Sequence, residues 1–278
     1  MRACRQFAIS KVAYGWIARA PPLTLCVQLW SCVHVGSRRI RSASVWLRAA
    51  LFGGSMHLDV LFATQLVGIM SRLRSRRALT WSTRSGSPAH ALHAWLLSWG
   101  WTRTSDWKWT HDMTRHSLDL TVAGKPGARQ HIVRDAWRVW CLQRHMSSSR
   151  RDADLDFFDE HGYFHRIDWE ATRKFASSGP EARAISTGAC FSPAALGGRV
   201  DRVAETCIWP GCEEHGTVDH IAWTCPCRPS SVEIPLKPGE FLSSRFGWDV
   251  SNSRVDMVAV QSWLVHEQMT VWLHAHSN

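Results

Sequence analysis

Lysine, tyrosine and long apolar runs are scarce in this sequence of 278 residues, and each scarcity narrows what the protein can be. Only five of the 33 basic residues are lysine, which leaves 28 arginines, and only two residues are tyrosine. The N-terminus has no clean signal peptide, and the most apolar stretch, 23–35, contains Gln28 and His34 and is too short to cross a membrane. We therefore expect a protein of the nucleus or cytoplasm that is neither secreted nor membrane-bound.

Several catalytic motifs are also missing. The sequence has no pair of adjacent aspartates, although catalysis by two metal ions needs carboxylates that converge within a few ångström. It has no nucleophile elbow, no HExxH helix, no P-loop and no zinc-deaminase signature. We therefore expect neither an enzymatic activity nor a small-molecule substrate.

The residues that are abundant are apolar and basic. Apolar residues make up 45% of the chain and 17 residues are tryptophan, which is enough for a substantial core in one or two domains. The net charge is +10 and the isoelectric point is about 9.6. Because arginine binds phosphate and stacks on bases, this composition suits non-specific binding of RNA or DNA. A GC-rich coding sequence would produce the same excess of arginine, so composition alone leaves both explanations open.

A cluster of cysteines near the C-terminus has the spacing of a zinc site. Cys207, Cys212, His220 and Cys225 form the pattern C-x4-C-x7-H-x4-C, and three thiolates with one imidazole make a tetrahedral zinc ligand set. A Trp-Pro-Gly turn separates the first pair, and a short helix would carry the second pair. His215 and Cys227 are competing ligands. The nine cysteines do not form a secreted disulfide framework, so a reducing compartment fits better.

Apolar periodicity predicts a mostly α chain: a helical region, a small CCHC zinc module and a C-terminal helix. The helices are expected at 42–51, 57–77, 90–98, 130–146, 165–177, 180–188 and 255–274, with paired strands at 106–109 and 116–122. In the helix at 130–146, Arg134, Asp135, Arg138 and Arg144 are expected to face solvent. The expected domains are a helical region (1–146), a linker with helices (147–198), the zinc module (199–230) and an extended linker with the last helix (231–278).

Two groups of arginines are candidates for contacts with nucleic acid. The first group lies at the end of the helix at 57–77: Arg72, Arg74, Arg76 and Arg77. Cations at this end also interact favourably with the negative end of the helix dipole. The second group flanks the zinc module: Arg199, Arg202 and Arg228. Five tryptophans between 95 and 109 could stack on bases if exposed, but we favour a core cluster. Trp209 and Trp223 could contact nucleic acid, and at least one of them is expected to cover the metal.

The zinc pattern, with Thr217 before the histidine and Trp-Thr-Cys-Pro at 223–226, resembles the C-terminal zinc knuckle of non-LTR (LINE-type) retrotransposon reverse transcriptases. From residue 11 onward, four further stretches look similar to that family. These are 11–22 (the exit from the polymerase palm), 95–109 (thumb and connection), 181–188 (the helix before the knuckle) and 245–248 (the short motif after it). Only the zinc spacing is specific. The resemblance implies a thumb/connection-like region followed by a CCHC knuckle.

The chain departs from this family where catalysis would lie. The family's polymerase uses palm carboxylates that include an aromatic-x-Asp-Asp motif, and the nearest imitation here is Phe-Phe-Asp-Glu at 157–160, too far downstream. The Pro-Asp-x-x-Asp endonuclease pattern is also absent. We therefore expect a truncated or degenerate copy that binds zinc and nucleic acid without polymerase activity. The alternatives are a zinc-dependent protein-interaction module and a product without a selected function.

Overall fold

The computed structural model describes residues 44–52, 57–75, 87–122, 124–148, 164, 167–188, 207, 209–214, 225–227, 246–250 and 258–266. They fall into two compact units, between which the chain passes several times, once within helix α3 (Val45–Phe52). The described part of the chain is mostly helical, which confirms the expected fold class at this coarse level.

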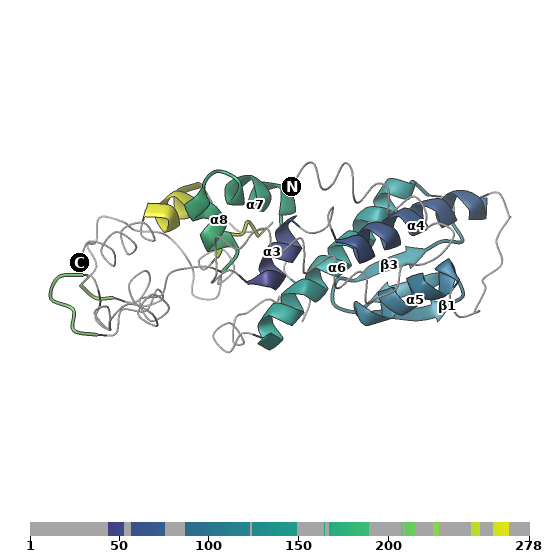
Figure 1. Ribbon diagram of the computed structural model, residues 1–278, viewed down its shortest axis with the longest axis horizontal. Helices are drawn as coiled ribbons and strands as arrows, with labels where there is room; N and C mark the ends of the chain where they lie inside the picture. Colours follow the sequence, from purple (N-terminus) through teal and green to yellow (C-terminus); the bar gives the residue numbers. More distant parts are fainter. Residues whose placement is uncertain are drawn as a thin grey trace. The chain divides into compact units, whose positions relative to one another are not determined.

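The first unit contains three helices and a small sheet (Figure 1). Helices α4 (Leu58–Ser75) and α6 (Pro126–Ser148) pack along each other, and α5 (Pro88–Ser98) contacts both α4 and the sheet. The buried hydroxyls of Thr64 and Ser71 in α4 donate to backbone carbonyls four residues earlier, both at 2.7 Å. These bonds satisfy polar groups that would otherwise be costly to bury.

The sheet is an antiparallel meander in the order β1 (Trp101–Ser105), β2 (Lys108–His111) and β3 (His116–Asp119). Strands β2 and β3 confirm the predicted pairing, with Trp109 opposite Leu118, although residues 106 and 107, predicted in the first strand, form the turn before β2. The sequence does not predict β1 because only its first residue, Trp101, is buried, so it lacks the apolar alternation of a half-buried strand.

The tryptophans between 95 and 109 lie in the core of this unit. Every one of them is buried, so the prediction of a core cluster is confirmed: Trp95, Trp99, Trp101, Trp107 and Trp109. His111 lies beside Trp101, with ring centroids 5.3 Å apart. Its Nε2 is 3.0 Å from the Trp99 carbonyl and its Nδ1 is 2.9 Å from the Thr114 hydroxyl, while burial lowers its pKa. A neutral His111 that donates through Nε2 and accepts at Nδ1 satisfies both contacts.

One sequence prediction about α6 is wrong. Arg138 does not face solvent, because only 4% of its side chain is exposed, and its Nη1 lies 2.8 Å from Asp135 Oδ1. The other oxygen of Asp135 lies 2.7 Å from His131 Nδ1. The periodicity assigned Arg138 to the outer face by its charge, but a paired arginine can be buried with its carboxylate partner.

The second unit is built around two short helices, α7 (Trp169–Ala176) and α8 (Pro180–Ser186). The Asp168 side chain accepts from the backbone N–H groups of Glu170 and Ala171 in the first turn of α7, which makes it an N-cap. A distant segment, 246–250, packs against both helices. Within it, Phe246 and Trp248 are fully buried, and Trp248 Nε1 donates to the Ser186 carbonyl at 3.0 Å.

Gly247 permits this packing. Its backbone has φ +62, a conformation that residues with a Cβ rarely adopt, and an added Cβ would lie 2.5 Å from the Phe175 ring. The contact between this segment and α7 continues at Asp249, whose N–H donates to the Thr172 hydroxyl at 3.0 Å. The stretches 181–188 and 245–248, which the sequence resemblance selected separately, therefore contribute to one core through residues such as Ile185, Ser186, Phe246 and Trp248.

A further helical segment at 258–266 buries Val260, Trp263 and Leu264. It lies within the predicted helix 255–274, the rest of which falls outside the described residues. Among the helices that the structure describes, none combines the length and apolarity needed to span a bilayer.

Candidate metal centre

The first two predicted ligands lie on one tight loop. Trp209-Pro-Gly-Cys212 forms a turn in which the Cys212 N–H donates to the Trp209 carbonyl at 3.1 Å. Proline at the second position and Gly211 at the third, with φ +82, are the residues that a type II turn requires. The Cys207 N–H also donates to the Glu214 carbonyl at 2.8 Å, which closes the base of the loop. The sequence prediction that this turn brings two sulfurs together is confirmed.

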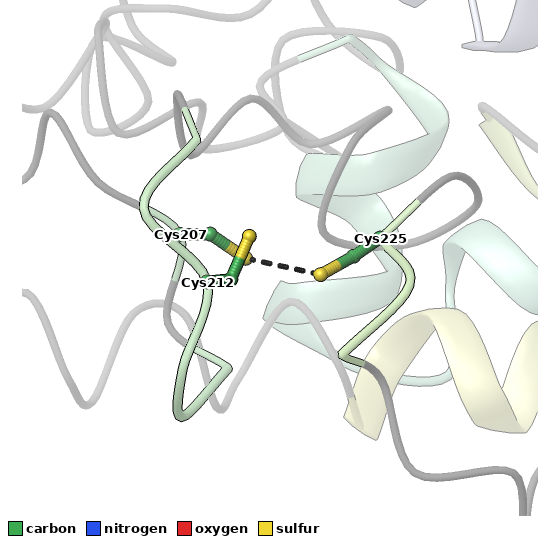
Figure 2. Close-up of side chains that lie close together, drawn as sticks. All are labelled: Cys207, Cys212 and Cys225. Atoms are coloured by element: carbon green, nitrogen blue, oxygen red, sulfur yellow. Dashed lines mark hydrogen bonds between the residues drawn. The ribbon is translucent and has the colours of Figure 1, made fainter.

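Three sulfurs converge at this loop. The Sγ atoms of Cys207, Cys212 and Cys225 all lie within 4.8 Å of one another, and those of Cys207 and Cys225 are 3.6 Å apart (Figure 2). Four ligands at the usual Zn–S distance of about 2.3 Å around a tetrahedral ion would have sulfurs about 3.8 Å apart. The observed separations therefore fit a zinc-sized ion, and none of these cysteines forms a disulfide.

The electrostatics of the cluster favour a cation. Burial and the neighbouring thiols of Cys225 and Cys212 raise the pKa of Cys207 to about 12, although the backbone N–H of Trp209 donates to this sulfur and opposes the rise. Closely packed thiolates repel one another, so without a positive charge the Cys207 thiol stays protonated. A divalent cation among the sulfurs would reverse that balance and deprotonate them.

Two further side chains pack against the cluster. Trp209 and Cys227 are half-buried there, beside the buried Cys207 and Cys225. Trp209 therefore packs against the cysteines, where a tryptophan expected to cover the metal would lie. Cys227, which the sequence offers only as a competing ligand, also lies at the cluster.

The remaining predicted site residues fall mostly outside the described part of the chain. This holds for His220, for the competing ligand His215, for Trp223 and for every arginine near the zinc module: Arg199, Arg202 and Arg228. Of the arginines at the end of α4, only Arg72 has a described side chain, and it is exposed. The side chain of Arg74 and the whole of Arg76 and Arg77 lie outside the described residues.

Sequence reasoning missed a cluster of ionisable groups between α4 and α6. The His57 ring lies 4.9 Å from that of Trp137, and burial raises the pKa of Asp59 to about 6. Burial, and after it the charge of Asp59, raises the pKa of the fully buried Cys141. A cysteine nucleophile needs a lowered pKa and access to substrate, whereas the Cys141 thiol is buried in the core and its pKa is raised.

Comparisons of the chain with protein-family models, with curated proteins and with solved structures find no match. The function is therefore inferred from the geometry of the candidate metal centre.

Proposed function

We propose that this chain is a zinc-binding, nucleic-acid-binding remnant of a non-LTR retrotransposon reverse transcriptase, located in the nucleus or cytoplasm. The observation that carries the proposal is the convergence of Cys207, Cys212 and Cys225 with separations that fit zinc. These three cysteines and one further ligand, for which the sequence pattern names His220, would form a structural zinc centre. Such a centre contributes its binding free energy to the folding of the small module around it.

The net charge of +10 and the arginine content support nucleic acid as the partner. Arginine forms bidentate bonds to phosphate, and such contacts carry little sequence information. The zinc ligands themselves are occupied by the metal, so contacts to nucleic acid would come from neighbouring arginines such as Arg199, Arg202 and Arg228. We expect binding to single-stranded RNA or DNA without strong sequence preference.

Salt dependence tests this part of the proposal. Fluorescence anisotropy of the zinc-loaded chain with labelled single-stranded RNA should show a log–log slope of about −0.7 for each phosphate neutralised. Replacing Arg74 and Arg77 with Glu should weaken binding to all sequences alike. The matched control replaces the exposed Lys125 and Lys174 with Glu, which changes the net charge equally. A flat salt response, or equal losses in both double variants, would retire the arginine contacts and favour a zinc-dependent protein-interaction module.

The proposal also holds that the chain is not a polymerase, because it lacks paired carboxylates in a palm-like context. Purified protein incubated with a primed RNA template, nucleotides and Mg²⁺ or Mn²⁺ should give no extension product. Extension above that of a mock purification would overturn this part of the proposal and leave the zinc centre untouched.

A further inference from the structure

The three converging sulfurs leave one position of a tetrahedron to be filled, and a fourth sulfur lies beside them. Cys227 follows Cys225 after a single proline, and the chain turns at residues 226–227. Because of this turn, the Cys227 side chain packs against the cluster. Cys227 is half-buried and packs against the buried pair Cys207 and Cys225.

The immediate neighbours of Cys227 are the other ligands themselves. Its thiol lies close to those of Cys212 and Cys225. Its sulfur is not among the three that lie within 4.8 Å of one another. It therefore lies beside the cluster, next to Cys212 and Cys225, and its side chain would have to move closer to become the fourth ligand.

We propose that Cys227 supplies the fourth ligand, so that the centre is a four-thiolate site for zinc or a similarly soft cation. This inference rests on the proposed zinc centre and changes its ligand set. It departs from the three-cysteine, one-histidine pattern that the sequence resemblance implies. A four-thiolate centre carries one more negative charge than a centre with a neutral histidine, and it selects soft metals more strongly.

The test counts thiolates in the metal-loaded full-length chain. Cobalt(II) replaces zinc in such sites, and the intensity of its sulfur-to-metal charge-transfer band rises with the number of bound thiolates. In Cys227→Ser, the charge-transfer intensity should fall by the contribution of one bound thiolate. Zinc affinity should fall by at least about 10-fold, since the loss of a residue that only hydrogen-bonds to a ligand already costs that much. His220→Asn should change neither, and Cys190→Ser is the matched control for losing a cysteine elsewhere.

An unchanged charge-transfer intensity in Cys227→Ser would overturn the inference while leaving the zinc centre in place. Failure of the wild-type chain to bind zinc or cobalt would instead overturn the proposed centre itself, so the two failures are distinguishable. Cadmium-113 NMR of the wild-type chain gives a second answer that needs no variant, because its chemical shift separates four-sulfur from three-sulfur, one-nitrogen coordination. A shift in the three-sulfur range would contradict the assignment of Cys227.

Discussion

Asp59 should make the first unit less stable as the pH rises. Its carboxyl group lies at the start of α4 near Cys141 of α6, and burial raises its pKa from 3.8 to about 6, although a hydrogen bond from the backbone N–H of Val60 opposes the rise. One pKa unit corresponds to about 1.4 kcal/mol, so the ionised form costs about 3 kcal/mol of folding free energy relative to the neutral form.

The sign follows from linkage. The folded state holds the Asp59 proton more tightly than the unfolded state, so the favourable contribution is complete below pH 3.8 and is lost as the pH rises through about 6. Asp59→Asn keeps a neutral side chain of similar shape at every pH. At pH 8 this variant should therefore be more stable than the wild type by up to about 3 kcal/mol, and near pH 4 the two should be nearly equal.

Urea unfolding at a series of pH values measures this difference, with a probe confined to the first unit, such as hydrogen exchange in α6. Taking the difference between the variant and the wild type removes the contribution of titratable groups that both proteins share. Parallel stability profiles from pH 4 to pH 8 would refute the reasoning, because they would show that the carboxyl group is not desolvated.

Two substitutions test the core of the second unit. Gly247→Ala should destabilise it by about 2 kcal/mol or more, since alanine at a left-handed φ costs roughly 1–2 kcal/mol and the new methyl group meets the Phe175 ring; Gly127→Ala, which meets no atom within 4 Å, is the control. Trp248→Phe keeps an aromatic ring but leaves the Ser186 carbonyl without its donor, so we expect a loss of about 1–3 kcal/mol. Thermal unfolding measures both, and wild-type stability in either variant would contradict the packing described for this segment.

The sequence predicts the helices well because their apolar residues repeat at helical spacing over long stretches. Helix α6 is the clearest example, although its buried Arg138 could not be predicted, since a salt bridge to Asp135 depends on packing that periodicity does not encode. Strand β1 was missed for a related reason: its burial comes from position in the sheet and not from an alternating pattern.

Parts of the candidate site could likewise be predicted from the sequence, and parts could not. The Trp-Pro-Gly turn and the pairing of Cys207 with Cys212 follow from local turn chemistry, which the sequence carries directly. Cys225 joins them from a separate segment, and the ligand pattern, with its turn and its histidine, predicted that it would lie close to them. The position of Cys227 depends on the turn after Cys225, so sequence spacing could offer it only as a competitor.

The central claim is that Cys207, Cys212 and Cys225 bind one zinc ion together. X-ray absorption at the zinc edge on the purified, zinc-loaded chain tests it most directly, because it reports the atoms bound to the metal. The account predicts one zinc per chain with at least three sulfur ligands at about 2.3 Å, and loss of that shell in Cys212→Ser. A chain that holds no zinc, or whose zinc has a first shell of oxygen and nitrogen alone, would contradict the account.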